Sequence, residues 1–193
     1  NSVDLAEKSM RADSRKVEVI PNGVDRFAFR PARLKAKYNS GLPIHLLFVG
    51  RFHSQKDVPG MLEMLGKAHA NHGLDFKLTL VGDGPEYKKA RQVATKIGLN
   101  KMIDWKGWLG RSELIGSYQQ ADCFLNLSRY EGLPNTVLEA MSCGLVVVAS
   151  DIAPHRELIE PEVTGYLVPI DQPKVLTRTL NRIAENSAKR EKI

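Results

Sequence analysis

The sequence predicts an α/β protein, a Rossmann-like three-layer α/β/α fold with a mostly parallel sheet of about six strands. Two observations predict this fold. Short apolar runs alternate with longer helical segments about six times along the chain, which is typical of strand–helix units joined by right-handed crossovers. Several of these runs, such as 145–149, are apolar throughout, as expected of strands that are covered on both faces.

Local patterns give the individual elements. Apolar residues recur at helical spacing across 58–72, Pro85 can open a helix after Gly84, and Gly144 ends a short helix that begins near Asn135. The predicted strands are 17–20, 44–50, 76–82, 102–105, 121–127, 145–149 and 165–168, with 106–109 as a loop. The predicted helices are 4–12, 58–72, 85–97, 112–118, the short one from 135, and 173–188.

Size and composition are those of a single globular domain. The 193 residues can enclose one hydrophobic core, so we predict one domain over residues 1–193. The content of 42% hydrophobic and 26% charged residues is ordinary for such a domain. No apolar run approaches the ~20 residues of a membrane-spanning helix, and the first residues show no signal-peptide pattern. A cytoplasmic location is therefore expected.

The charge and the metal-ligating residue types narrow the partners. The net charge is +6, from 28 Lys and Arg against 22 Asp and Glu, which favours anionic partners or an anionic membrane surface. The basic residues are spread along the chain, so nucleic acid is not the expected partner. The two cysteines, Cys123 and Cys143, stand in apolar runs and are predicted to be buried thiols. With five scattered histidines they give no metal-ligand spacing, so no metal site is predicted.

Two carboxylates stand where ligands collect in an open α/β sheet. Glu131 follows an apolar strand, and Glu139 lies on the next helix, on the same face as Asn135. The unpaired N–H groups of a helix N-terminus suit a phosphate, and carboxylates accept from hydroxyl groups. Together these suit a nucleotide sugar. The spacing alone equally allows Glu131 to cap a turn and Glu139 to be a solvated helix residue.

Two cations flank the carboxyl end of the strand at 44–50. Arg51 follows this strand, and Lys56 precedes the helix at 58–72. An Arg fork and a Lys point charge in this position can neutralise a diphosphate without a metal ion. A lone Arg and Lys are more often solvated surface cations, so this pattern does not decide by itself. Gly82 and Gly84 are followed by Pro-Glu-Tyr, without the third glycine of a dinucleotide-binding fingerprint, so a nicotinamide cofactor is not predicted.

Four motifs together resemble one family. The first motif is Glu131 followed by Gly-x-Pro, with a second Glu eight residues after the first, then Ala-Met and a Gly before a Val-rich strand. The second is Gly-Arg with a Lys five residues after the Arg. The other two are Pro-Asn-Gly-Val-Asp at 21–25 and Val-Gly-Asp-Gly-Pro at 81–85. The chain resembles the retaining GT-B glycosyltransferases (glycosyl transferases group 1), and within them the C-terminal, donor-binding domain.

The resemblance implies a role for each matching residue. Arg51 and Lys56 would stabilise the departing diphosphate, Glu131 would hold the sugar hydroxyls, and Glu139 would hold the ribose hydroxyls. The backbone near the start of the short helix and the glycines would lie against the nucleotide: Gly132, Asn135, Thr136, Gly82 and Gly84. No cofactor is implied beyond a nucleoside diphosphate sugar, with a UDP-sugar favoured.

The resemblance also covers only half of such an enzyme. The N-terminal acceptor domain is absent from this chain, so the isolated domain is expected to bind a nucleoside diphosphate weakly and to be inactive. The acceptor would be a polysaccharide or a lipid-linked saccharide, with peripheral association at the cytoplasmic membrane face.

The sequence departs from the family pattern at two loops. Asp57 stands where the family more often has Gly, and a carboxylate pointing inward there would weaken the anion site. Ala153-Pro154 stand where the family usually has Gly-Gly, which places the contacts of that loop in doubt. We expect His155 to be a surface residue rather than a base, and the tryptophans Trp105 and Trp108 to be core residues.

Three alternatives remain beside the glycosyltransferase. A related sugar-nucleotide epimerase would release free sugar instead of forming a glycoside. The chain could also be a non-catalytic nucleotide-binding module, which would be favoured if Glu131→Ala in the full protein left sugar transfer intact. A basic Rossmann-like nucleic-acid binder would bind random DNA with a steep dependence on salt, and it ranks last because no basic and aromatic stripe is present.

Overall fold

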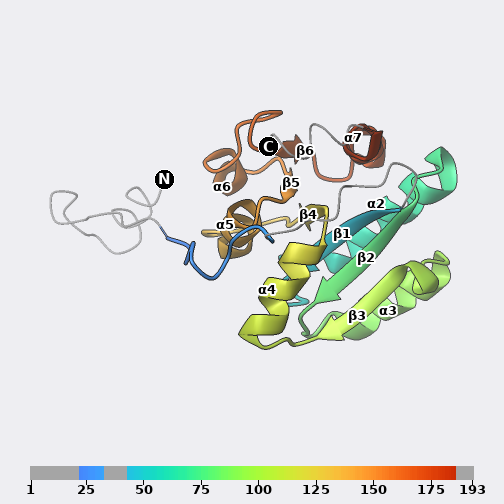
Figure 1. The fold of residues 1–193 in the computed structure, drawn as a ribbon. Coiled ribbons are helices and arrows are strands. Elements are labelled where there is room, and N and C mark those ends of the chain that lie inside the picture. The colour runs from blue at the N-terminus through green and yellow to red at the C-terminus, as the bar shows by residue number, and fades with distance from the viewer. Residues whose placement is uncertain (1–21, 33–42, 186–193) are drawn as a thin grey trace, which may run out of the picture.

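The computed structural model describes residues 22–32 and 43–185. The predicted helix at 4–12, the predicted strand at 17–20 and the last turn of the predicted final helix lie outside these residues. Within them the prediction of a three-layer α/β fold is confirmed, as Figure 1 shows.

A parallel sheet of six strands forms the middle layer in the order β3-β2-β1-β4-β5-β6. β1 and β4 are neighbours in the middle of the sheet. β2 and β3 extend the sheet on the side of β1, and β5 and β6 extend it on the side of β4. The strands are β1 (Ile44–Val49), β2 (Phe76–Val81), β3 (Ile103–Gly107), β4 (Cys123–Asn126), β5 (Val146–Ser150) and β6 (Tyr166–Val168).

Helices cover the two faces of the sheet. One apolar cluster joins the sheet to α2, α3 and α7, and a second joins its other face to α4 and α5, which lie on the opposite side in Figure 1. The helices are α2 (Val58–His72), α3 (Tyr87–Lys96), the 3₁₀ turn η2 (Asn100–Met102), α4 (Arg111–Gln120), α5 (Asn135–Ser142), α6 (Ala153–Arg156) and α7 (Pro173–Glu185).

The reversal of strand order creates the crevice that positions a site. The loop after β1 leads to α2 on one face of the sheet, and the loop after β4 leads to α5 on the other face. Because the two loops diverge from neighbouring strands, they leave a crevice at the carboxyl edge of the sheet. This is where ligands bind in open α/β sheets.

A few local predictions are corrected. Lys106 and Gly107 belong to β3 rather than to the following loop. The side chain of Trp108 is 82% exposed, so it is not a core residue, whereas Trp105 is half-buried between Tyr87 and the core. Both cysteines are buried, as predicted.

Two glycines bring the loops after β1 and β2 into close contact. A Cβ on Gly82 would lie 2.0 Å from the carbonyl oxygen of Gly50, and one on Gly84 would lie 2.5 Å from that of Phe52. Gly82 also has φ +123°, in the region that favours glycine. The backbone of the loop that carries Arg51 and Lys56 is therefore packed against the turn at 82–84.

Substitution of Gly82 tests this contact. Gly82→Ala is expected to lower the free energy of unfolding by about 3 kcal/mol or more, because it adds a backbone clash to an unfavourable φ. Gly116→Ala, within α4 and with open space around the added Cβ, is the control and should gain about 0.5–1 kcal/mol. Equal stability of the two variants in urea unfolding would contradict this account.

Candidate functional site at the carboxyl edge of the sheet

An ion pair spans the crevice between the loops that follow β1 and β4. Lys56 Nζ lies 2.5 Å from Glu131 Oε1, and both side chains are largely shielded from solvent, with 20% and 8% exposure. The two residues are 75 positions apart in the chain and meet only because β1 and β4 are adjacent. The structure thus brings together the central cation and the central carboxylate of the predicted site.

Three donors converge on one oxygen of Glu131. Besides Lys56, the amide of Asn126 donates to Oε1 at 3.0 Å, and the hydroxyl of Ser128 reaches it at 2.8 Å. The Ser128 hydroxyl also lies within hydrogen-bond distance of Asn126 Oδ1. No described residue donates to Oε2. Glu131 therefore has one oxygen fixed by the protein and one that can accept hydrogen bonds from a ligand.

This setting keeps Glu131 ionised. Burial alone would raise the pKa of Glu131, but the bond and the charge of Lys56, with Ser128 and Asn126, hold the pKa below its usual value. A carboxylate that stays charged is an acceptor for hydroxyl groups at neutral pH.

Arg129 ties the two loops together. Its Nε donates to Asp57 Oδ2 at 2.5 Å, its terminal nitrogens donate to Asp171 at 3.1 and 3.2 Å, and its backbone N–H donates to Gln55 O. Asp57 in turn accepts from Gly60 N at the start of α2. The Asp57 carboxylate is thus committed to a helix cap and an arginine, which offsets its charge. The backbone of Asp57 has φ +45°, in the left-handed region that glycine adopts without steric cost.

Arg51 lies on the same loop as Lys56, and its side chain is exposed. Its guanidinium makes no hydrogen bond or ion pair with the described residues. It therefore remains available to an anion at the edge of the sheet, whereas Lys56 is already held by Glu131.

The start of α5 closes the site from the other side. Asn135 is the first residue of this helix, and its side chain accepts from Asn22 Nδ2 at 2.6 Å, which brings Asn22 beside it. The hydroxyl of Thr136 is buried with no partner among the described residues. Gly132 is exposed and has open space around it.

Glu139 lies one turn further along α5, and its carboxylate is half-buried. It accepts from the Tyr118 hydroxyl at 2.7 Å. Burial raises the pKa of Glu139 above its usual value, although the Tyr118 bond and the charge of Arg111 act in the opposite direction. The structure therefore moves the pKa values of the two predicted site carboxylates in opposite directions, with Glu131 lowered and Glu139 raised.

His155 corrects the sequence prediction. It is fully buried, not a surface residue, because α6 folds back against the end of β5. Its ring packs beside Ser150, whose hydroxyl donates to the carbonyl of Ser128 at 2.5 Å. Sequence reasoning also missed Asn126, Ser128 and Arg129. Their closeness to Glu131 in the chain was a signal, but their partners on other loops were not visible in the sequence.

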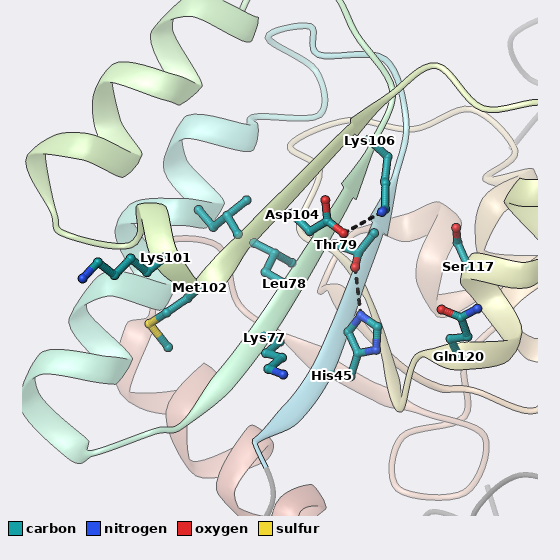
Figure 2. A pocket seen from close by; sticks show the side chains of 11 residues that line it. His45, Lys77, Leu78, Thr79, Lys101, Met102, Asp104, Lys106, Ser117 and Gln120 are labelled. Carbon is teal, nitrogen blue, oxygen red and sulfur yellow. Dashed lines mark hydrogen bonds and ion pairs between the residues drawn. The ribbon is translucent and has the colours of Figure 1, made fainter.

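A separate cavity lies elsewhere in the described part of the chain. It has a volume of about 270 Å³ and is lined by residues of β1, β2, β3 and α4 (Figure 2), and neither Lys56 nor Glu131 is among them. Its floor includes the bond between His45 Nε2 and Thr79 Oγ1 at 2.8 Å, and Asp104 pairs with Lys106 at its rim. None of the predicted site residues lines it.

Among the described residues, no group of three or more His, Cys, Asp or Glu side chains could hold a metal ion. In the same part of the chain, no helix is both long and apolar enough to cross a membrane.

Comparison with known proteins identifies the family. Residues 33–193 match the family described as glycosyl transferases group 1. The chain belongs to this family. The match covers the whole sheet and the Lys56–Glu131 pair, and the predicted resemblance to glycosyl transferases group 1 is confirmed.

Curated relatives of this glycosyl transferases group 1 chain include bacterial glycosyltransferases. It is 32% identical to the lipopolysaccharide 1,6-galactosyltransferase of Escherichia coli K12 over 126 residues, which is 63% of this chain and 34% of that protein. It is 28% identical to an Escherichia coli UDP-Gal:alpha-D-GlcNAc-diphosphoundecaprenol alpha-1,3-galactosyltransferase, over 95% of this chain and 49% of that protein. The chain thus spans about a third to a half of these relatives.

Solved structures share the fold. The C-terminal domain of the glycosyl transferase group 1 family protein LpcC from Francisella tularensis matches with a TM-score of 0.74 and 24% identity, over 89% of this chain and 92% of that one. Sucrose-phosphate synthase from Thermosynechococcus elongatus matches with a TM-score of 0.82 and 23% identity, over 99% of this chain and 49% of that one. The binding roles of the individual site residues stay predictions.

The ion pair can be tested through stability. Lys56→Met keeps the stem but leaves the shielded Glu131 carboxylate without its cation, and we expect a loss of about 2 kcal/mol at pH 8. In the wild type, the lowered pKa of Glu131 means that the pair stabilises the fold above the unfolded pKa and less as pH falls through the folded one. In the variant only the hydrogen bonds from Ser128 and Asn126 still oppose burial, so the pKa of Glu131 should rise and the loss should shrink by pH 5.

Urea unfolding at the two pH values measures this. Lys56→Met with Glu131→Gln should recover most of the stability, because no charge is left buried. Lys77→Met, at an exposed lysine on β2, is the control and should change the stability by less than about 0.5 kcal/mol. A loss independent of pH would show that the pair does not stabilise the fold in this way.

Proposed function

We propose that this chain is the donor-binding domain of a retaining glycosyltransferase. The complete protein would move a sugar from a nucleoside diphosphate sugar, with a UDP-sugar favoured, to an acceptor such as a polysaccharide or a lipid-linked saccharide. The observation that carries this proposal is the Lys56–Glu131 pair, which lies across the crevice between β1 and β4, with no donor to Glu131 Oε2 from the part of the chain that the structure describes. This arrangement offers cations and an acceptor within one crevice.

The cations would act on the diphosphate. The ammonium of Lys56 has three hydrogens and uses one for Glu131, so two remain for phosphate oxygens. Arg51 has no partner among the described residues and can add a bidentate contact. The first N–H groups of α5, near Asn135 and Thr136, would supply further donors. Charge that develops as the diphosphate departs would thus meet fixed positive groups.

The two carboxylates would divide the donor between them. Glu131 would hold the sugar hydroxyls through Oε2, which places the anomeric carbon, and Glu139 would hold the ribose. The bond from the anomeric carbon to the phosphate oxygen would break, with its electron pair going to the diphosphate. The acceptor oxygen would bond to that carbon on the same face, and its proton would pass to the departing diphosphate. Glu131 need not act as a nucleophile.

Names of related proteins support a UDP-sugar. The Anabaena protein Alr3699/HepE, which shares the fold with a TM-score of 0.80 and 20% identity, has been solved with UDP and glucose. One curated relative is named for UDP-Gal and for an undecaprenol-linked acceptor. A lipid-linked acceptor would bring the complete protein to the cytoplasmic membrane face.

The acceptor would be bound by a part of the protein outside this chain. The chain spans about a third to a half of the curated relatives, and we propose that residues 1–193 are one donor-binding domain that works against an N-terminal acceptor domain. No metal or further cofactor is part of this proposal, because Arg51, Lys56 and the helix N-terminus would supply the positive charge.

Nucleotide binding tests the donor site directly. Calorimetry should show weak binding of UDP to the isolated chain without turnover of a UDP-sugar. Glu139→Gln is expected to weaken UDP by about tenfold, because a charge-assisted hydrogen bond becomes a neutral one. Lys77→Gln, at an exposed lysine remote from the crevice, is the control and should bind as the wild type does. Absence of binding at millimolar UDP, GDP and ADP would overturn the proposal.

The pH dependence of binding tests Glu139. Because burial raises its pKa, Glu139 should protonate before a typical carboxyl group as pH falls, and it then accepts hydrogen bonds less well. The affinity for a UDP-sugar, whose diphosphate keeps a constant charge between pH 4 and 8, should therefore fall as the pH is lowered from 8 to 4. Glu139→Gln should bind weakly at every pH. If the affinity of the wild type and of Glu139→Gln fell equally as the pH is lowered, Glu139 would not be part of the binding site.

A further inference from the structure

A buried histidine lies behind the candidate site, joined to it by hydrogen bonds. His155 has no exposed surface, and its Nδ1 lies 2.8 Å from the carbonyl oxygen of Ser150 and 3.2 Å from the Ser150 hydroxyl. It belongs to α6, directly after β5, the strand that pairs with β4. The residue therefore stands one strand away from the strand that leads to Glu131.

The hydrogen bonds fix the tautomer of this ring. The Ser150 hydroxyl has one hydrogen, which it donates to the carbonyl of Ser128 at 2.5 Å. Both groups that face Nδ1, the Ser150 carbonyl and the Ser150 hydroxyl oxygen, therefore act as acceptors. Nδ1 must carry the hydrogen, which leaves Nε2 as the unprotonated nitrogen of the neutral ring.

The same bonds connect this ring to Glu131. The Ser150 hydroxyl holds the backbone of Ser128, and the side chain of Ser128 reaches Glu131 Oε1 at 2.8 Å. Each link joins the carboxyl end of one strand to its neighbour, from α6 through β5 to the loop after β4. A shift of the His155 ring would thus be passed on to the turn that orients Glu131.

The other ring nitrogen finds no hydrogen-bond partner within residues 22–32 and 43–185. Nε2 is buried, and no described residue offers it a hydrogen bond. Burial lowers the pKa of His155, the Ser150 carbonyl and the charge of Glu131 act to raise it, and Lys56 acts to lower it. A buried acceptor without a donor costs roughly 1–3 kcal/mol, a cost that an apolar residue would avoid. Retention of an imidazole here needs a reason beyond filling space.

We propose that His155 is a positioning residue for Glu131. Its neutral, Nδ1-protonated ring fixes Ser150, Ser150 fixes the Ser128 carbonyl, and the turn at 127–131 then aims Glu131 Oε2 at the donor sugar. The proposal rests on the proposed function, because it assumes that Glu131 binds that sugar. It assigns the role to the Nδ1–H donor, and not to the bulk or the charge of the ring.

Two amides of different length separate these roles. His155→Asn places an amide N–H near the position of Nδ1 and keeps a donor for Ser150. His155→Gln carries its amide nearer the position of Nε2 and loses that donor. His155→Leu keeps much of the bulk and no polar atom. His45→Asn is the matched control, because His45 is likewise a hydrogen-bonded histidine, although only partly buried, and it lines the cavity of Figure 2 instead of the crevice.

The experiment uses the complete protein that contains this chain, with kcat for sugar transfer and the Kd for UDP measured separately. His155→Gln and His155→Leu should lower kcat about 10- to 100-fold with the UDP Kd within about twofold, because the sugar and not the nucleotide is misplaced. His155→Asn should retain kcat within about threefold, and His45→Asn should match the wild type. Nitrogen NMR of histidine-labelled protein should show His155 protonated at Nδ1.

A second variant guards against loss of the fold. Ser150→Ala removes the hydroxyl that reaches Ser128, with little change in volume, and should give the same fall in kcat at constant UDP affinity. The proposal is overturned if His155→Asn is as slow as His155→Leu, if UDP affinity falls together with kcat, or if Nε2 carries the hydrogen. Failure of the wild type to bind UDP or to transfer sugar would instead count against the proposed function itself.

Discussion

The ion pair between Lys56 and Glu131 is the interaction on which the site depends. It joins two loops that leave neighbouring strands toward opposite faces of the sheet, at the one place where the strand order reverses. Desolvating these two charges is costly, and the cost is offset only because Asn126 and Ser128 complete the hydrogen bonding of Glu131 Oε1. The fold therefore supports the pair, and the pair fixes the geometry of the crevice.

The surroundings of this pair are arranged to keep it in place. Arg129 links the loop after β4 to the start of α2 and to Asp171 near the start of α7, and the glycines at 82 and 84 bring a third loop into backbone contact. These contacts come from four separate connections between strands and helices. The proposed donor site would be largely formed before any ligand arrives, which would reduce the ordering that binding otherwise requires.

The sequence was sufficient for the fold and for the main residues of the site. Apolar runs and helical spacing place the strands and α2 well, because a sheet buried on both faces leaves a strong pattern. They also place Glu131 and Lys56 at the carboxyl ends of their strands. What they cannot give is the strand order, and without it the contact between two residues 75 positions apart is not determined. The family resemblance, and not the spacing, predicted that contact.

The failures have physical causes as well. His155 follows Pro154 in a short polar segment that looks exposed, but α6 is a single turn folded under the end of β5. Trp108 is large and apolar, yet it follows the last residue of an edge strand and has no layer above it. In both cases tertiary position decided burial, and local composition did not.

The three donors on Oε1 of Glu131 have a consequence for stereochemistry. A carboxylate that is free to rotate can follow a hydroxyl that changes from equatorial to axial, and so tolerates both epimers of a sugar. Here one oxygen is immobilised, so the lone pairs of the other point in set directions. If Glu131 binds the donor sugar as we propose, an inverted hydroxyl would lose its acceptor, and selection between epimeric donors would follow from the rigidity of this one side chain.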